Sequence, residues 1–468
     1  MHATTPAALA RPLSEYFLED LLLTEDFDSL ELAIADGMRR IACRAMERCL
    51  ESFDGMLADS MPYGWSVHER ASRTVITLVG AVTFKRTIFL DRFGRRRAWA
   101  DELLGIPKRS RLSANAFLWI ARTAADLSYR KTAAAFEFLS GAAVSHVTVM
   151  RCVHEEGRLL AAAPPDERHV SSAVAYVEAD GLWVHLQNPE HRDEALPRGV
   201  YEQARRTCSF ELKMACMYAG KKKVNGRVTR GNLSVIAADE EPEAFWSRIV
   251  SQLAADYEID DLETIWLGAD GGQWCGPGRL EEIAPEGADV RFSLDPFHVT
   301  KAICRAFPEG PKREWALRLA YRRKPAQLVR MCGKVAAKLP AGKRRDKVRE
   351  LEGYIANHSR GIAFPRPSLG TMEGTNYHFA ACRVKGNATS WSRRGATAMV
   401  LIKCALLTGR PLIAPSKDAF FTGKEIAAES SFRSRLAGSV AKSVGGGSEW
   451  PHSHDMSKHC AISVSRRS

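Results

Sequence analysis

The chain has 468 residues, a hydrophobic share of 45% and a net charge of +12. This length exceeds one ordinary domain, so two or three domains with packed cores are expected. No apolar run approaches the roughly 20 residues that span a bilayer, and the first residues lack the pattern of a signal peptide. The 11 cysteines contain no Cys-x-x-Cys pair, which predicts reduced thiols in a cytoplasmic protein without disulfides or a zinc site.

An acidic region, residues 1–70, opens the chain. Apolar residues recur at roughly helical spacing from Phe17 to Ile41, which predicts helix. Residues 1–60 carry 12 Asp+Glu against 5 Lys+Arg, so this region is negatively charged. The basic excess of the chain therefore lies further along.

Two runs rich in β-branched and aromatic residues follow, at Thr74–Val79 and Ala81–Leu90. They meet near Gly80, which favours a β-hairpin. A basic turn at Arg92–Arg97 is expected after the second run.

Two short helices joined by a glycine turn are predicted next, within a region of residues 71–165. Ser128 is placed to cap the first helix, and Ser145 to cap a second that begins at His146. This pattern matches a helix-turn-helix that reads DNA, but any small helical hairpin has a similar sequence. The candidate DNA-contacting residues of the pair are Arg130 and Arg151.

Five strand-like runs with intervening helices indicate a mixed α/β sheet. The runs cover residues 173–186, 210–218, 233–238, 264–267 and 290–294, and a basic turn is predicted at Lys221–Gly226 between the second and third runs. A helix that begins at Pro242 separates the third run from the fourth. This order is that of the ribonuclease H fold, so a multidomain α/β protein with a ribonuclease H-like mixed-sheet core is predicted.

A basic helical segment interrupts this core. Residues 300–360 carry 17 Lys+Arg against 5 Asp+Glu, which is typical of a surface that binds a polyanion, although a solvated helical face has the same composition. The expected parts after the helix-turn-helix are a first core segment at 170–308, the insertion at 309–365, a last core segment at 366–410 and a disordered tail at 411–468.

Three carboxylates are candidate ligands of catalytic metal ions. Asp180 and Asp270 each lie at the end of a strand and precede a glycine, and Glu373 opens a helix after the basic segment. Two-metal phosphodiester cleavage needs carboxylates around ions about 4 Å apart, and magnesium takes a few carboxylates while it keeps waters. We predict these three residues as catalytic metal ligands, with Mg²⁺ as cofactor and Mn²⁺ as its substitute.

Taken singly, each of these motifs has an ordinary structural explanation. An Asp-Gly pair after a strand is usually a turn, and a glutamate in the first turn of a helix interacts favourably with the helix dipole. The specific signal is the ordered combination of all three on an α/β sheet.

A second constellation surrounds Asp295 and His298. Asp295 followed by Pro296 suits a helix start, so a cap explains it as well as a direct role does. Lys301 and Arg305 share a helix face with His298 and are suited to grip phosphate. We predict His298 as catalytic, and Asp295, Lys301 and Arg305 as DNA contacts.

Basic residues also follow Glu373 on the last predicted helix. Arg383 and Lys385 are candidate DNA contacts close to the carboxylates. Trp391 either stacks on a base or anchors the core, and the core interpretation is favoured.

Short passages spread over residues 70–405 resemble the transposases of ISLre-two-type bacterial insertion sequences. The passages are Asp101–Pro107, Leu127–Arg130, Ser145–Val149, Val177–Gly181, Gly268–Gly271, Leu294–His298, Met372–Gly374 and Ser390–Gly395. The resemblance implies a DDE transposase whose ribonuclease H core carries an all-helical insertion before the glutamate. Asp180, Asp270 and Glu373 fall on its triad positions, and Asp295 with His298 resembles a signature of Mutator-like enzymes.

The resemblance also implies partners and a location. Double-stranded DNA, as terminal inverted repeats and as target, is the expected partner, with a homo-oligomer in the synaptic complex and no membrane. The location implied is the bacterial cytoplasm at the nucleoid. Residues 188–207 have no counterpart in the family pattern, and the resemblance fades after residue 411, which leaves the activity of this copy open.

The sequence is compatible with three functions. A magnesium-dependent transposase would cut element ends and join 3′-hydroxyl ends to target DNA. A transposase-derived DNA-binding protein would keep the helix-turn-helix without catalysis, and a ribonuclease H-like host nuclease would cleave without strand transfer. The ordered triad favours the transposase.

Overall fold

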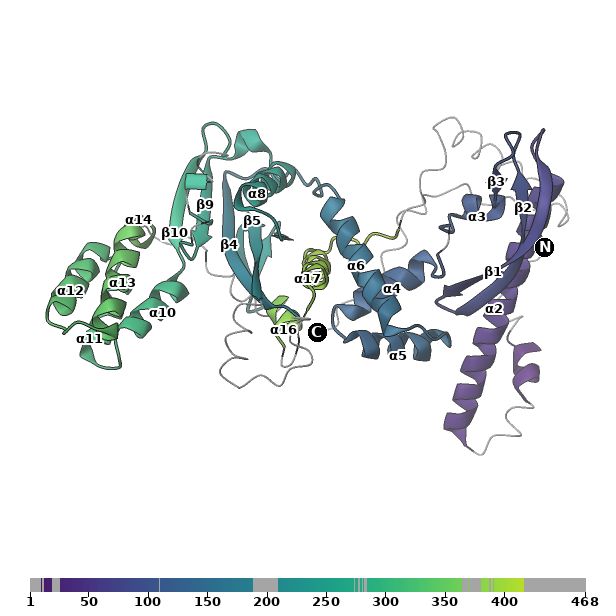
Figure 1. Cartoon of the computed structure of the whole chain (residues 1–468), viewed down its shortest axis with the longest axis horizontal. Coiled ribbons are helices and arrows are strands. Elements are labelled where there is room, and N and C mark those ends of the chain that lie inside the picture. Colours follow the sequence, from purple (N-terminus) through teal and green to yellow (C-terminus); the bar gives the residue numbers. More distant parts are fainter. Residues whose placement is uncertain are drawn as a thin grey trace. The chain divides into compact units, whose positions relative to one another are not determined.

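The computed structural model divides the described residues into two compact units, one that ends at Arg111 and one from Leu112 to Pro415 (Figure 1). The described residues are 10, 12–18, 26–108, 110–187, 209–272, 274–276, 278–279, 281, 284–363, 369, 380–386, 389 and 391–415. The cysteines in these ranges form no disulfides. Within the same ranges, no helix combines the length and the apolar character that crossing a bilayer requires.

The first unit places one long helix against a three-stranded antiparallel sheet. Its elements are α2 (Phe27–Asp59), β1 (Ser66–Thr77), β2 (Gly80–Leu90), β3 (Arg96–Arg97) and α3 (Trp99–Leu104). The predicted hairpin is confirmed, and β1 begins earlier in the chain than the apolar pattern indicated. The expected basic turn contains the short strand β3, which pairs with the end of β2.

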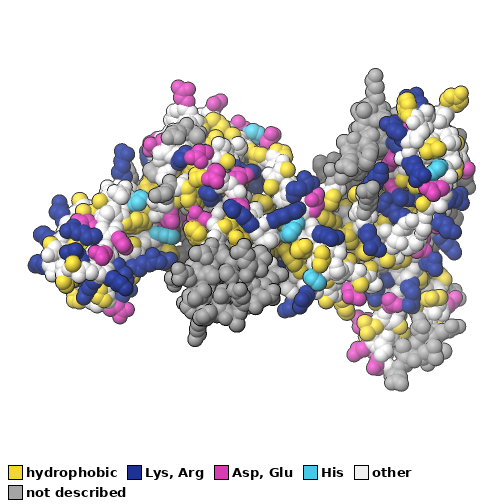
Figure 2. Space-filling view, in the orientation of Figure 1, with side chains coloured by type: hydrophobic (Ala, Val, Ile, Leu, Met, Phe, Trp, Pro, Cys, Tyr) yellow, Lys and Arg dark blue, Asp and Glu magenta, His cyan; other side chains and the backbone are white. Residues whose placement is uncertain are grey.

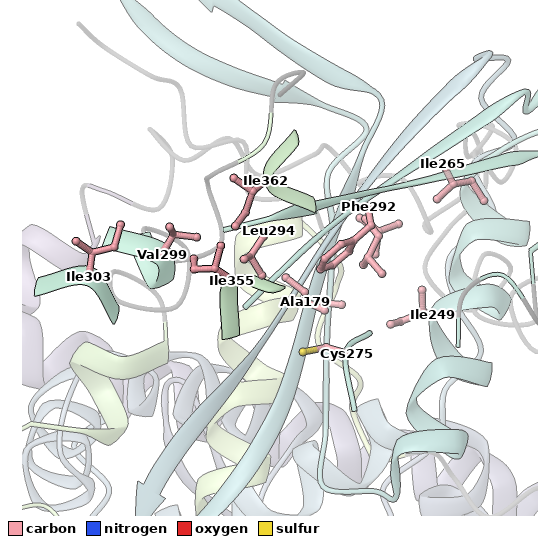
Figure 3. Close-up of a cluster of buried hydrophobic side chains, with 14 of the residues drawn as sticks. Ala179, Ile249, Ile265, Cys275, Phe292, Leu294, Val299, Ile303, Ile355 and Ile362 are labelled. Atoms are coloured by element: carbon pink, nitrogen blue, oxygen red, sulfur yellow. The ribbon is translucent and has the colours of Figure 1, made fainter. Parts of the chain in front are cut away.

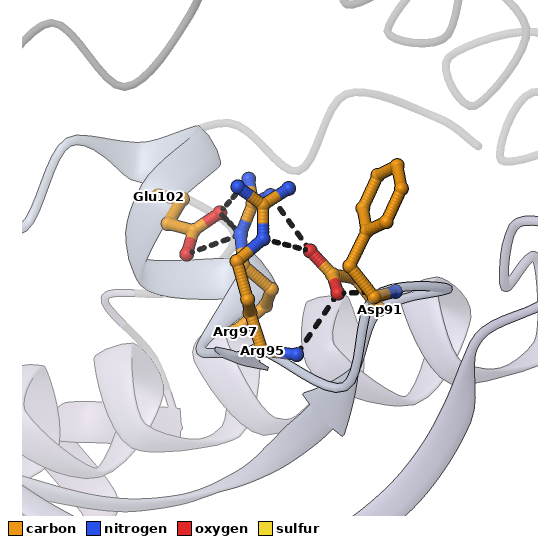
Figure 4. Close-up of polar contacts among 5 residues, drawn as sticks. Asp91, Arg95, Arg97 and Glu102 are labelled. Carbon is orange, nitrogen blue, oxygen red and sulfur yellow. Dashed lines mark hydrogen bonds and ion pairs between the residues drawn. The ribbon is translucent and has the colours of Figure 1, made fainter.

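Hydrogen bonds and ion pairs between side chains connect these elements. The Asp54 carboxylate on α2 accepts from the Thr87 amide at 2.8 Å and from its hydroxyl at 2.7 Å, which fastens the helix to β2. Around the turn into α3, Asp91 accepts from Arg95, and Arg97 forms a two-pronged pair with Glu102 (Figure 4).

An aspartate at the start of α3 joins two arginines from the sheet. Asp101 is 3% exposed and pairs with Arg73 at 2.5 Å and with Arg86. Arg73 also donates to the carbonyl oxygens of Pro107 and Ser110 at 2.7 and 3.1 Å. Burial and the neighbouring Arg73 lower the pKa of Arg86 to about 10. This passage of the sequence therefore holds the sheet to the segment that follows it.

The second unit begins with three helices. They are α4 (Ala114–Ala124), α5 (Tyr129–Ser140) and α6 (His146–Ala162). Ser128 and Ser145 accept hydrogen bonds from backbone amides three residues on, and Gly141 ends α5 with φ 70°. The predicted helix pair is thus confirmed with its caps.

A five-stranded mixed sheet forms the centre of the second unit. Its strands are β4 (Val174–His185), β5 (Ser209–Tyr218), β8 (Ser234–Ala238), β9 (Thr264–Ala269) and β10 (Asp289–Leu294), which confirms all five predicted strands. The order is β10-β9-β4-β5-β8, with β4–β9 and β9–β10 parallel and the remaining pairs antiparallel. Where a basic turn was expected, a separate hairpin forms from β6 (Gly220–Val224) and β7 (Arg227–Gly231).

Helices cover this sheet and extend beyond its β10 edge. The remaining elements are α8 (Pro242–Asp256), η2 (Ile259–Asp261), α10 (Pro296–Ala306), α11 (Pro311–Tyr321), α12 (Pro325–Ala337), α13 (Lys343–Asn357), α14 (Ser359–Ala363), α16 (Cys382–Val384) and α17 (Arg393–Thr408). One apolar cluster runs from Ile249 on α8 through Ala179 on the sheet to Ile355 on α13 (Figure 3). The basic helices therefore share the core of the sheet.

Candidate functional site

The sheet register places three aspartates side by side. The last paired residues are Ala179 with Ala269 on β4 and β9, and Ala269 with Leu294 on β9 and β10. The next residues along these three parallel strands are Asp180, Asp270 and Asp295. The three aspartates therefore lie side by side where the parallel pairing ends. The register therefore brings Asp180 and Asp270, two of the three predicted carboxylates, close together on adjacent strands.

A histidine from the first turn of α10 completes the cluster. Asp180, Asp270 and His298 each offer one ligand atom, and these atoms lie within 4.8 Å of one another. The side chains of His298 and Asp270 are 29% and 32% exposed, so both are reachable from solvent, and His298 Nδ1 lies 3.9 Å from Asp270 Oδ2. The pocket around them is also lined by Glu178, Ser293 and Asp295.

This donor set fits a divalent cation. Ligands on opposite sides of an ion bound at about 2.1 Å lie about 4.2 Å apart, so a 4.8 Å cluster needs only a small adjustment to close on one. Carboxylates suit Mg²⁺ and Mn²⁺, whereas an imidazole ligand favours Mn²⁺ and other transition metals. The third predicted carboxylate, Glu373, lies outside the described residues.

The loop after β9 orients the Asp270 carboxylate. Its Oδ1 accepts from the Gly272 amide at 2.8 Å and from the Cys275 thiol at 3.0 Å, which leaves Oδ2 toward His298. Burial raises the pKa of Cys275, and the adjacent Asp270 carboxylate raises it further, so the thiol stays protonated as a donor. Sequence reasoning did not identify Cys275 as part of the site.

The helical insertion holds the same loop from the other side. The Tyr354 hydroxyl on α13 donates to the Asp270 carbonyl oxygen at 2.9 Å, and His358 Nε2 lies 3.0 Å from the Gly271 carbonyl oxygen. Gly271 has φ +82°, and a Cβ there would lie 2.5 Å from His358 Nε2. The glycine is thus required both for its backbone conformation and for this close approach.

Tyr354→Phe is expected to lower the free energy of unfolding by about 1 kcal/mol, because the Asp270 carbonyl oxygen loses a partly buried hydrogen-bond donor. Any metal-dependent activity of the site should fall as well, since the loop that carries Asp270 loosens. Urea denaturation and an activity assay would measure both effects. Tyr321→Phe is the matched control, because Tyr321 lies on α11 and is 89% exposed. Equal behaviour of the two variants would contradict a positioning role for Tyr354.

A buried glutamate stands on the same strand face as Asp180. Glu178 precedes Asp180 by two residues, is 3% exposed and accepts from the Tyr218 hydroxyl at 2.5 Å. The period-two alternation of a strand contained the signal that Glu178 shares this face, but sequence reasoning did not use it.

Cations flank the pocket from α10 and from the segment after α16. Lys301 and Arg305 are exposed on α10, and Lys385 follows α16 at the surface. Partial desolvation lowers the pKa of Lys385 and Lys301 lowers it further, whereas the Asp180 carboxylate acts in the opposite direction. These interactions place Lys385 and Lys301 in the neighbourhood of the carboxylates.

The other residues that were predicted to contact DNA are Arg383, Arg130 and Arg151. The Arg383 guanidinium donates to the carbonyl oxygens of Ala124 and Leu127 at 3.3 and 3.0 Å and lies over the Trp391 ring. Trp391 is buried, which confirms its core interpretation. Arg130 and Arg151 are exposed on α5 and α6.

Asp295 has a defined structural role. Its side chain accepts from the Phe297 amide at 2.9 Å as the N-cap of α10, which confirms the cap interpretation. It also lines the pocket beside Asp270, so the cap holds a carboxylate at the site.

Comparison with known proteins finds similarity over most of the chain. Residues 21–414 match the family described as Uncharacterised protein family (UPF0236). A curated relative, the UPF0236 protein in vanSb 3'region of Streptococcus gallolyticus, is 22% identical over 400 residues, which is 83% of this chain and 85% of the relative. The matched residues include the sheet, the cluster of Asp180, Asp270 and His298, and the helical insertion. This chain therefore belongs to the UPF0236 family.

Proposed function

We propose that this protein is a DNA transposase that cuts phosphodiester bonds at element ends and joins 3′-hydroxyl ends to target DNA. The observation that carries the proposal is that Asp180, Asp270 and His298 offer ligand atoms within 4.8 Å of one another, where the parallel pairing of β4 with β9 ends. The sheet order, in which only β5 runs against the other four strands, supports a ribonuclease H-like core.

The residues around the pocket have complementary roles in this proposal. Asp180 and Asp270 would hold divalent ions, Mg²⁺ or Mn²⁺, which neutralise charge on the attacking and leaving oxygens of a phosphodiester. His298, with Lys301 and Lys385, stands where positive charge and hydrogen bonds can meet phosphate oxygens. Glu373 is proposed as the third carboxylate on the sequence pattern alone.

The charge of the second unit supports a long polyanionic substrate. Figure 2 shows Lys and Arg side chains gathered over the helices that follow β10, in the stretch that carries the basic excess. Exposed Arg130 and Arg151 on the α5–α6 pair offer a further basic surface. Such surfaces suit duplex DNA, both as terminal inverted repeats and as target, and a homo-oligomer that brings two ends together.

The test is an assay on duplex DNA that contains the sequences flanking the gene, with Mg²⁺, Mn²⁺ or a chelator. The expected result is nicking that leaves 3′-hydroxyl ends and then joining of those ends to a second duplex, with both steps abolished by the chelator and by Asp180→Asn. Salt-sensitive binding without nicking would indicate a DNA-binding protein. Cleavage of branched or hybrid substrates without joining would indicate a host nuclease.

A further inference from the structure

A short β-ribbon in the second unit carries an unusual concentration of positive charge. Residues 220–231 contain five basic side chains and no acidic one. The basic residues are Lys221, Lys222, Lys223, Arg227 and Arg230. This segment leaves the central sheet between β5 and β8 and forms the separate two-stranded sheet of β6 and β7.

The turn and the cross-strand bonds define the shape of the ribbon. Asn225 and Gly226 have φ 50° and 80°, the left-handed pair that a tight two-residue hairpin turn requires. The Thr229 hydroxyl donates to the Lys222 carbonyl oxygen at 3.1 Å, across the two strands. The lysines therefore have a fixed register on a defined ribbon.

Side chains on both faces of this ribbon are exposed to solvent. Lys222, Lys223 and Thr229 are exposed, and Val224 and Val228 are 51% and 63% exposed. An isolated two-stranded hairpin is marginally stable in water, and exposed valines on it bury no core. A ribbon with this composition is better suited to contact a partner than to stabilise the fold.

The base of the ribbon connects it to the candidate site. The Lys221 ammonium lies 5.7 Å from the centre of the Tyr218 ring, and the Tyr218 hydroxyl donates to Glu178 in the pocket. Lys221 thus packs on the sheet, whereas Lys222 and Lys223 extend from it. Whatever the ribbon binds is consequently held to the same sheet as Asp180 and Asp270.

We propose that the β6–β7 hairpin is a DNA-binding ribbon that lies in the major groove of duplex DNA, with Lys222 and Lys223 on the phosphates. Strands of five residues extend about 16 Å, enough to cross a major groove about 12 Å wide that admits a two-stranded ribbon. The positive charge complements the phosphates. The register puts Val228 on the face of Lys223, and alternation puts Val224 on the face of Lys222, so either face offers one valine for apolar contact to base edges. This inference rests on the proposed function for the identity of the polyanion.

The test uses two double variants. One combines Lys222→Gln and Lys223→Gln, and the charge-matched control combines Lys222→Arg and Lys223→Arg. Fluorescence anisotropy would measure binding of the full-length protein to a 30-base-pair duplex from 50 to 300 mM salt. If each lysine makes one phosphate contact, the glutamine variant should show a slope of log K against log salt that is shallower by about 2. Its affinity at 0.1 M salt should be roughly tenfold to fiftyfold weaker, and the arginine variant should retain the wild-type slope.

The possible outcomes separate this inference from the proposed function. A glutamine variant with the wild-type slope would overturn the assignment of the ribbon, while salt-dependent binding by the wild type would leave the proposed function in place. Absence of salt-dependent DNA binding by the wild type would overturn both. Lysine-dependent binding to vesicles of anionic phospholipid, without the same dependence on DNA, would also overturn the ribbon assignment.

Discussion

Asp270→Asn is expected to reduce DNA strand cleavage by about 10³-fold or more, which corresponds to about 4 kcal/mol of transition-state stabilisation. The substituted amide keeps the shape of the side chain but removes the charge that would hold a divalent ion beside Asp180 and His298. DNA affinity should stay equal or increase, because one negative charge near the phosphates is gone. A cleavage assay and a binding assay on the same variant would separate these two effects.

The stability of this variant gives an independent check. Two carboxylates whose ligand atoms lie within 4.8 Å repel each other by about 1 kcal/mol at a water-like dielectric, so the metal-free Asp270→Asn protein should unfold no more easily than the wild type. Asp289→Asn is the matched control, because Asp289 begins β10, is 59% exposed and pairs with Arg291 at the surface. Wild-type cleavage by Asp270→Asn would refute the proposed chemistry.

Asp101→Asn is expected to destabilise the first unit by about 3–5 kcal/mol. The carboxylate pairs with two arginines whose side chains are only 9% and 18% exposed, so its loss leaves two buried guanidinium groups without their counter-ion. Burial lowers the pKa of Arg73 and of Arg86, because it disfavours the charged form of each guanidinium group.

Hydrogen exchange of the backbone amides of β1 and β2, read by mass spectrometry, would report this effect within the first unit. The same substitution at an exposed carboxylate is the control. Asp36 on α2 is 49% exposed and lies 3.5 Å from Arg39, so Asp36→Asn should cost at most about 1 kcal/mol. Equal protection of the sheet amides in the two variants would show that the Asp101 cluster contributes little.

The sequence alone determined where the elements of this protein lie. Apolar, strand-like runs located all five central strands, and serines at 128 and 145 located two helix starts, because apolar runs and capping are local properties of the chain. The position of Asp270 after a strand followed in the same way, whereas Asp180 lies inside β4, which continues to His185. The hairpin at Asn225-Gly226 also had a local signal, but it was interpreted as a turn without strands.

Only the tertiary structure decided which partners these residues meet. Cys275 and Tyr354 donate to Asp270, Arg383 donates to the carbonyl oxygens at the end of α4, and Asp101 joins two arginines of the sheet. These contacts join residues that are distant in the chain or lie in irregular loops, where periodicity carries no information about neighbours. Periodicity records which face of an element is apolar, whereas the partner of a polar side chain is set by how the faces of different elements pack together.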